Sequence, residues 1–326
     1  MDGERQDGAA WRAEVERGFV AEVESGRLKL PLPGAGRTRL RWEALAALAR
    51  RDLSLARLCE GHTDAVAILA ELAGPAPAAG SRWGVWAAQP PGPSLSARPV
   101  ATGWRLSGTK RYCSGARVCT HALVTAETPD GHRLFAVAAE DLRPVEGSWP
   151  ATGMAASDTL DVRFDDVAGE PVGPVEGYVR RPGFHQGGAG VAACWYGGAK
   201  GVAEALLAAA AEREVGPHAL AHLGAVDVAL RTAKAALEEA ADEIDADPRD
   251  LKNAGRTRSL RLKALVEAVA TDVMGRVGRA LGAGPLGHDA AHGRRVADLT
   301  VYLRQHHAER DLAALGAIVA EQGARW

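Results

Sequence analysis

The sequence predicts an α+β protein of several domains, in which N-terminal helices precede an antiparallel β domain and a C-terminal four-helix bundle. Three observations support this prediction. Leucine and isoleucine recur at three- and four-residue spacings through residues 41–73, which is the period of an amphipathic helix. Residues 83–181 hold short runs of β-branched and aromatic residues between turns, and the chain from residue 197 is again helical in pattern. The predicted domains are 1–80, 81–181 and 182–326.

Each predicted element ends at a recognisable signal. The first helical region closes at GPAPAAG, residues 74–80. In the β domain, dipeptides such as Asp130-Gly131 suit tight turns, and about five to seven strands are expected. Proline, glycine and a capping aspartate separate the predicted helices of the last domain, which are 198–215, 220–246, 250–280 and 294–322. Long helices with short connections form antiparallel bundles, because each helix needs neighbours to cover its apolar stripe.

The composition excludes several classes of partner. The chain has 326 residues, with 39 Lys and Arg against 41 Asp and Glu and a formal net charge of −2. Nucleic acid is not predicted as a partner, because phosphate backbones are bound by clustered Lys and Arg. The four cysteines contain no CxxC pair, and the His, Asp and Glu residues show no metal-ligand spacing. The sequence therefore predicts no metal site and no disulfide framework.

Nothing in the sequence is typical of a membrane or secreted protein. Charged residues interrupt every apolar run well short of the roughly 18 to 20 residues that span a bilayer. The N-terminus is charged and lacks the apolar segment of a signal peptide. We therefore expect a cytoplasmic protein without a membrane partner.

Two stretches of the β region match patterns of a known enzyme family. GWRLSGTKRYCSGA, residues 103–116, is similar to the pattern "G-x-x-L-x-G-x-K-x-W-I-T-x-A", with Tyr112-Cys113-Ser114 in place of Trp-Ile-Thr. GMAASDTLDVRFDDV, residues 153–167, is similar to "G-x-x-x-S-x-T-x-x-V-x-F-x-x-V". With the predicted order of helices and strands, the sequence resembles the acyl-CoA dehydrogenase family of FAD-binding flavoproteins. The resemblance implies a central antiparallel β-barrel domain, and an N-terminal α domain trimmed relative to the family.

The resemblance also implies where a flavin would bind. Tyr112 and Ser114 would meet the isoalloxazine ring, and Ser94 and Arg213 would contact the pyrophosphate, since an Arg fork pairs with phosphate oxygens. Taken alone, Ser94 is typical of a turn, Arg213 of a solvated helix end and Gly282 of a helix C-cap. The full set of implied cofactor-binding residues is Ala87, Ala88, Gln89, Ser94, Tyr112, Cys113, Ser114, Arg213, Arg279, Gly282 and Gly284.

The catalytic base departs from the family pattern. In most members a glutamate of a "Y-E-G-T" segment removes the α-proton of the substrate. When Asp298 is aligned with the family's aspartate, Gln305 or His306 stands at the glutamate position. Three interpretations stay open: His306 or His307 is the base, Glu309 takes the role one helical turn later, or these residues form a solvated face. A histidine here is also similar to the family's monooxygenase branch.

The leading prediction is an FAD-dependent oxidoreductase that dehydrogenates the Cα–Cβ bond of an acyl thioester, carried on CoA or on a carrier protein. Its electrons would pass to a separate acceptor such as an electron-transfer flavoprotein. His62, His185, Trp195 and Tyr196 are the candidates for the substrate pocket, although aromatic residues there are also typical of a core. Two alternatives are an FAD-dependent monooxygenase on the same fold and a flavin-free binding or assembly subunit. The resemblance further implies a homodimer or homotetramer.

Overall fold

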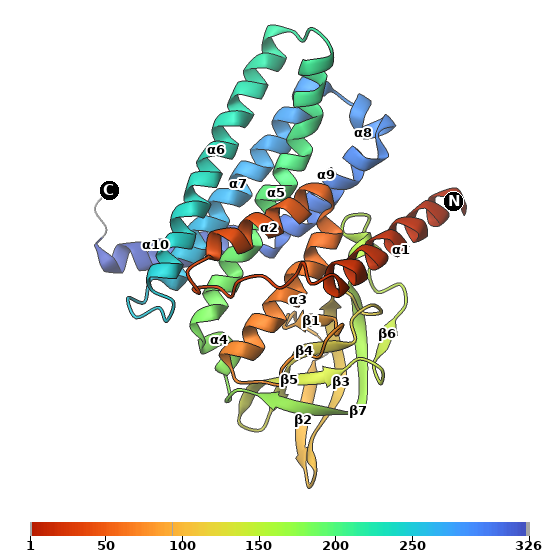
Figure 1. Ribbon diagram of the computed structural model, residues 1–326, viewed down its shortest axis with the longest axis vertical. Coiled ribbons are helices and arrows are strands. Elements are labelled where there is room, and N and C mark those ends of the chain that lie inside the picture. The colour runs from red at the N-terminus through yellow and green to blue at the C-terminus, as the bar shows by residue number, and fades with distance from the viewer. Residues whose placement is uncertain (1, 93, 324–326) are drawn as a thin grey trace. The chain divides into compact units, whose positions relative to one another are not determined.

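The computed structural model describes residues 2–92 and 94–323, which form two compact units built from separate stretches of the chain (Figure 1). The barrel unit comprises the chain up to Leu30, Arg57–Ala151 and Ala155–Phe184. The helical unit comprises Pro31–Ala56, Thr152–Met154 and the chain from His185 onward. Among the described residues, no helix combines the length and the apolar character needed to cross a membrane. The mixture of helices with a sheet confirms the predicted α+β class.

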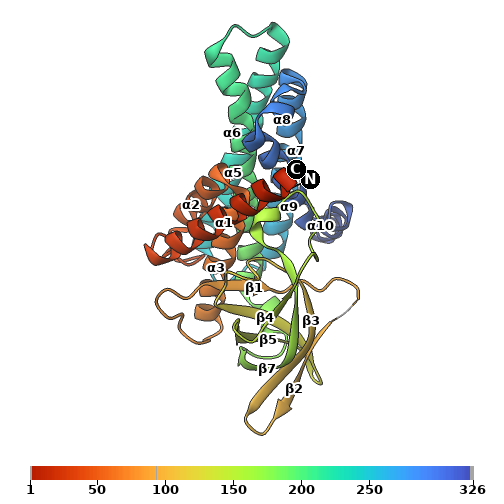
Figure 2. The same ribbon diagram turned by 90° about the vertical axis from the view of Figure 1, so that its right-hand side faces the viewer.

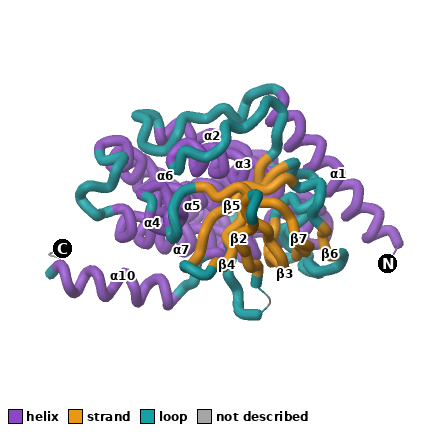
Figure 3. Tube along the Cα trace, turned by 90° about the horizontal axis from the view of Figure 1, so that it is seen from below, coloured by secondary structure: helices purple, strands orange, loops and turns teal. Residues whose placement is uncertain are grey.

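Five strands of the barrel unit close into a ring in the order β4, β2, β3, β7, β5 and back to β4. β1 extends this sheet beside β4, and β6 pairs with β7. Figures 2 and 3 show the strands curving around one another. The strands of the described residues are β1 (Trp83–Trp86), β2 (Leu95–Val100), β3 (Gly103–Cys113), β4 (His121–Thr128), β5 (Gly131–Ala138), β6 (Arg143–Val145) and β7 (Leu160–Val172).

The prediction of an antiparallel domain is wrong at two pairings. β4 runs parallel to both β1 and β2. Alternation of apolar and polar residues reports which face a residue occupies, and it carries no information on strand direction. The predicted turn at Asp130-Gly131 is present, since Thr128 pairs with Gly131 where β4 turns into β5, and Gly131 has φ +130°.

A helix of the N-terminal region supplies part of the barrel unit's core. α3 (Leu53–Glu71) contributes Ile68 and Leu69, which pack in one buried cluster with Leu123 and Leu134 of β4 and β5. Together with Ala65 of the same cluster, Ile68 and Leu69 follow the three- and four-residue spacing of a helix face. Leu123 and Leu134 lie on the inward face of the strands, so both periodicities converge on one core. The barrel unit also contains α1 (Asp2–Glu24), η1 (Ala155–Ser157) and α4 (Gly177–Arg180).

Long helices dominate the helical unit, where α5, α6 and α7 lie side by side (Figures 1 and 2). α6 begins at Pro217, three residues before the predicted start at residue 220, and it ends at Ala246 before Asp247-Pro248, as predicted. The helices of this unit among the described residues are α2 (Thr38–Arg51), α5 (Pro182–Glu212), α6 (Pro217–Ala246), α7 (Gly255–Leu281), α8 (Gly284–His288), α9 (Ala290–Tyr302), η2 (Leu303–Gln305) and α10 (Glu309–Gln322).

Two predicted helices in this unit have markedly different bounds in the structure, and a third, predicted from residue 250, begins at Gly255 with Ala254 at the N-cap. The predicted helix 198–215 begins at Pro182, because its glycine-rich first turns pack closely: a Cβ on Gly190 would lie 3.1 Å from the indole nitrogen of Trp42. The predicted helix 294–322 is two helices, since α9 ends at Tyr302 and Ala308 has φ +45°. Tertiary packing overrides low helix propensity in the first case. In the second, the break carries neither Gly nor Pro.

The start of α2 is fixed by a carboxylate from α6. Asp245 accepts hydrogen bonds from the Thr38 hydroxyl at 2.6 Å, the Thr38 N–H at 2.9 Å and the Gly36 N–H at 3.0 Å. Thr38 is fully buried, so its donors have no water to replace this partner.

Replacing Asp245 with alanine is expected to lower the free energy of unfolding by about 2 to 3 kcal/mol, since three donors lose their acceptor. Asp227→Ala is the control, because Asp227 forms an exposed pair with Arg231 one turn away on the same helix. That change should cost less than about 0.5 kcal/mol. Urea unfolding followed by circular dichroism measures both, and equal losses would contradict the capping role.

Asp298 on α9 holds the short stretch Thr152–Met154 within the helical unit. Its carboxylate accepts from the Met154 N–H at 2.5 Å and from the Ser54 hydroxyl at 3.2 Å, and its side chain is almost fully buried. A Cβ on Gly153 would overlap the carbonyl oxygen of Ala297, so the stretch lies directly against the α9 backbone. Burial raises the pKa of Asp298 to about 7.

Candidate active site

The predicted flavin-facing residues of the barrel unit come together where β1 and β3 end. The Trp86 indole N–H donates to the carbonyl of Ser114 at 2.9 Å and so joins the two strand ends. The Lys110 ammonium, buried inside, donates at 2.8 Å to both the carbonyl and the hydroxyl of Thr125. That hydroxyl donates in turn to the carbonyl of Ala87 at 3.4 Å. Ala87, followed by the exposed Ala88 and Gln89, therefore lies beside the end of β3.

Tyr112, near the end of β3, has an unusual backbone conformation. It has φ +61° and its side chain is 41% exposed. The Trp149 ring meets it edge-on at 6.1 Å, and the Arg111 guanidinium lies 5.1 Å from its centroid. A left-handed conformation at a bulky residue costs of order 1 kcal/mol or more, and such residues cluster at functional sites. An exposed aromatic held in this way is suited to contact a flat ligand.

Ser114 begins a chain of buried hydroxyls that the sequence prediction did not identify. Its hydroxyl lies 2.9 Å from that of Thr159, which lies 2.8 Å from that of Ser157. Thr159 and Ser157 are the Thr and Ser of the motif at residues 153–167, so their places in that motif could have identified them. Cys113 points the other way: it is fully buried, donates to the Lys110 carbonyl at 3.3 Å, and burial raises its pKa well above the usual value. Its side chain is therefore inside the barrel unit and not beside Tyr112.

Ser94 lies on an exposed loop that approaches β3 closely. Its carbonyl accepts the Thr109 N–H at 3.2 Å. Gly108 has φ +129°, and a Cβ there would overlap the Ser94 carbonyl oxygen, so glycine is required. Arg111 donates to the carbonyl of Pro91 at 3.3 Å. An exposed hydroxyl and a guanidinium thus flank the same loop.

Of the three candidate bases, only His306 is buried. Its side chain is 3% exposed, and neither ring nitrogen has a hydrogen-bond partner among the described residues. His307 is exposed, with its ring 3.6 Å from Asp311, and Glu309 is exposed at the first position of α10. Burial lowers the pKa of His306, and the neighbouring Asp311 opposes this effect.

His306 lies within a group that we call the His306 cluster, made of Trp195, Lys263, Tyr302, His306 and Asp311. Nε2 of His306 is 3.9 Å from the Asp311 carboxylate. The positive charge of Lys263 acts to lower the pKa of both groups. The Lys263 ammonium lies 6.0 Å from the Trp195 ring, and Tyr302 meets that ring edge-on at 6.4 Å. Burial lowers the pKa of Lys263. The cluster draws on α5, α7, α9 and the start of α10, and it contains one buried imidazole.

The other pocket candidates are not gathered at this cluster. Tyr196 follows Trp195 on α5 but lines a separate cavity with α2 and α6. His62 accepts the Trp83 N–H at 3.2 Å, meets Phe19 edge-on, and burial lowers its pKa to about 4, so it acts as a core residue of the barrel unit. His185 is half-buried in the first turns of α5, where a loop was predicted.

The residues of the helical unit that the resemblance implies for FAD binding form no built site among the described residues. Gly282 caps α7 with φ +69° and donates to the Gly278 carbonyl at 2.9 Å, as the C-cap interpretation predicts. Gly284 begins α8 and is exposed. Arg213 and Arg279 are exposed near the ends of α5 and α7. Within the described part of the chain, no group of three His, Cys, Asp or Glu side chains is arranged to hold a metal ion.

Comparisons with known proteins identify the fold. No family model and no curated protein matches the chain. Its structure is similar to that of KijD3 in complex with FMN and a dTDP-linked amino sugar, with TM-score 0.80, 22% identity, and coverage of 97% of this chain and 92% of KijD3. FMN-bound TdsC from Paenibacillus sp. A11-2 gives TM-score 0.78 at 19% identity, with 95% and 96% covered.

The methanesulfinate monooxygenase MsuC from Pseudomonas fluorescens gives TM-score 0.77 at 18% identity, with 98% of this chain and 97% of MsuC covered. At such identities the likeness establishes the fold alone. The chain has the acyl-CoA dehydrogenase-like fold that these flavin enzymes share. The predicted resemblance is therefore confirmed at the level of fold.

Proposed function

We propose that the protein is a flavin-dependent monooxygenase that uses FMN. The buried His306, with two ring nitrogens that no described residue satisfies, carries this proposal. α,β-Dehydrogenation requires a carboxylate base over the substrate. The carboxylate predicted for that role, Glu309, is exposed, whereas the buried group at this place is an imidazole. The fold neighbours support the same choice, because TdsC and MsuC are described as monooxygenases.

The residues at the ends of β1 and β3 suit a flavin ring. An isoalloxazine has an apolar face and polar edges. Tyr112 and Trp149 offer aromatic surface, and the backbone of Ala87–Gln89 with the Ser114 hydroxyl offers polar groups. Ser94 would hold a single phosphate together with Arg111, whose guanidinium also lies 3.7 Å from the Asp161 carboxylate. The fold neighbours KijD3 and TdsC are described in complex with FMN, which supports FMN as the cofactor over FAD.

His306 would serve as the proton donor and acceptor of the reaction. A reduced flavin, when bound, supplies the two electrons with which O₂ places one oxygen atom in the substrate and the other in water. Forming that water needs two protons from the reduced cofactor or the solvent, and an imidazole can relay protons one at a time near neutral pH. Because burial lowers the pKa of His306, the ring is neutral at pH 7, and Asp311 at 3.9 Å stabilises the protonated form. Trp195 and Tyr302 of the same cluster are also buried.

Stopped-flow mixing of the reduced, FMN-loaded protein with O₂ tests the proposal. We expect an oxygen-dependent absorbance transient before the oxidised flavin spectrum returns. His306→Ala should change its decay rate by about tenfold or more, and His307→Ala, at an exposed site, by less than about twofold. The wild-type rate should also change below pH 6.5, the ordinary pKa of histidine, and this change should be absent in His306→Ala.

Three outcomes would overturn the proposal. Direct bleaching of the flavin by acyl-CoA thioesters would establish the dehydrogenase instead. A protein that takes up neither FMN nor FAD in a fluorescence titration would favour the flavin-free subunit. FAD binding about tenfold more tightly than FMN would refute the choice of cofactor. The predicted homodimer or homotetramer stays part of this proposal and is measured by light scattering.

A further inference from the structure

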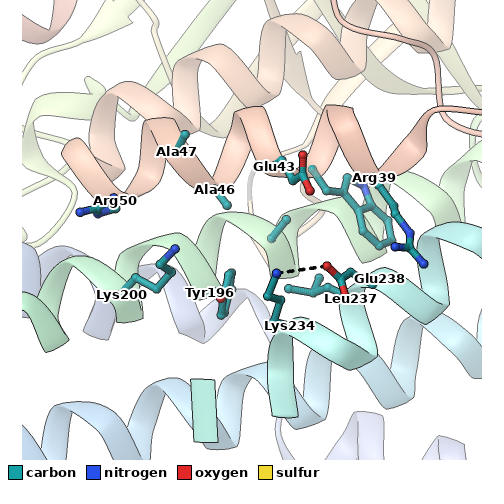
Figure 4. A pocket seen from close by; sticks show the side chains of 12 residues that line it. Arg39, Glu43, Ala46, Ala47, Arg50, Tyr196, Lys200, Lys234, Leu237 and Glu238 are labelled. Atoms are coloured by element: carbon teal, nitrogen blue, oxygen red, sulfur yellow. Dashed lines mark ion pairs between the residues drawn. The ribbon is translucent and has the colours of Figure 1, made fainter. Parts of the chain in front are cut away.

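A cavity of about 210 Å³ lies in the helical unit between α2, α5 and α6 (Figure 4). Trp42, Ala46 and Ala47 of α2 face it from one side, and Leu237 of α6 from another. Tyr196 projects from α5 between them. The walls are mainly apolar, with charged side chains at the rim. No part of the proposed flavin chemistry uses this cavity.

One cation of the cavity lacks a counter-ion. Arg39 pairs with Asp242, Arg50 pairs with Glu204, and the Lys234 ammonium is 3.4 Å from the Glu238 carboxylate. Lys200 instead lies with its ammonium 5.6 Å from the Tyr196 ring, and it forms no ion pair with any described residue.

The acidic groups of the cavity do not neutralise Lys200. Glu43 lies toward the Arg39 end in Figure 4, whereas Lys200 lies toward the Arg50 end. Glu204, one turn along α5 from Lys200, is engaged by Arg50. A cation–π contact of this kind orients an ammonium and leaves its charge available to an anion. The cavity therefore joins an apolar interior to a single available positive charge.

We propose that this cavity binds a monocyclic aromatic carboxylate, with its ring against the apolar walls and its carboxylate on Lys200. An apolar cavity of about 150 Å³ accepts a benzene molecule, so a volume near 210 Å³ has room for the ring and a carboxylate. A second negative charge would find no partner, because the other cations are paired. The site is independent of the proposed flavin chemistry, and its ligand acts as substrate or effector according to whether the ligand is turned over.

Benzoate is the probe, and its binding is measured by ligand-observed NMR titration of the protein with and without FMN. Lys200→Gln should raise the dissociation constant at least about tenfold. Lys234→Gln is the matched control: it removes a charge from the same rim, but one already paired with Glu238, and should change binding by less than about twofold. Benzamide, which has the same shape without the charge, should bind the wild type as weakly as benzoate binds Lys200→Gln.

Three results would overturn the proposal. They are the absence of benzoate binding, equal effects of the two lysine variants, and equal binding of benzamide and benzoate by the wild type. Equal lysine effects would mean diffuse attraction to a basic rim. Because FMN binding is measured separately, failure here leaves the proposed monooxygenase intact, and failure of flavin binding leaves this site intact.

Discussion

Replacing Gly197 with alanine is expected to lower the free energy of unfolding by about 3 kcal/mol, because the added Cβ has no space. It would overlap the carbonyl oxygen of Ala46 and lie 2.8 Å from the Cα of the same residue. These are backbone atoms of α2, so no side-chain rotation relieves the overlap. The two helices would have to separate at their closest approach, and Trp42 and Leu45, both buried on α2, would lose packing.

Gly224→Ala is the matched control for this prediction. Gly224 is also in a long helix of the same unit, is exposed, and has nothing within 4 Å of an added Cβ. Alanine there should stabilise the protein by about 0.5 to 1 kcal/mol through helix propensity alone. Chemical denaturation of both variants measures the difference. Similar stabilities would show that α5 and α2 do not approach each other at Gly197.

The second large effect is a loss of stability with rising pH that depends on Asp298. Burial raises the pKa of this carboxyl to about 7, against 3.8 in the unfolded chain. Its contribution is therefore fully present below about pH 4, falls as the unfolded chain ionises, and is lost once the pH passes 7. A shift of about three pKa units corresponds to roughly 4 kcal/mol. Asp298 is almost fully buried, so solvent screens this effect little.

Asp298→Asn separates the charge from the hydrogen bonds. The amide oxygen can still accept the Met154 N–H, and the amide nitrogen can donate to the Ser54 hydroxyl. The variant should therefore equal or exceed the wild type in stability at pH 8 and lack its decline between pH 5 and pH 8. Asp298→Ala, which loses both contacts, should be less stable at pH 5. Urea titrations at both pH values decide this, and parallel curves for wild type and Asp298→Asn would contradict it.

Local signals predicted those parts of the fold that they control. Pro217 and Pro248 bound α6, and Asp130-Gly131 forms the β4–β5 turn, because each acts within a few residues of itself. The break at Ala308 and the helical start at Pro182 depend on distant contacts, such as Trp42 beside Gly190, which neighbouring residues do not report. The direction of the strands in the barrel could not be predicted either, because the alternation of apolar and polar residues reports only which face of the sheet a residue occupies.

The same contrast between local signals and distant contacts applies to the candidate site. Tyr112 and Ser114 were placed beside Ala87 through motif order, and the indole of Trp86 joins their strands. Trp195 and Tyr196 were expected in one pocket, but successive helical residues point about 100° apart. Trp195 is buried in the His306 cluster, whereas Tyr196 lines the cavity between α2, α5 and α6. Which histidine is buried could not be predicted, because His306 and His307 are adjacent and only the break before α10 distinguishes them.

The interleaving of the two compact units determines the order in which they can be completed during synthesis. The chain passes between them five times, so neither unit is one uninterrupted segment of the sequence. The ribosome synthesises α2 early, yet the Thr38 N–H can donate to the Asp245 carboxylate only after 207 further residues have been made. Ala46 meets Gly197 only after every barrel strand has been made. The nascent helical unit must therefore keep the apolar face of α2 unburied throughout synthesis of the barrel, which is when this chain most needs protection from aggregation.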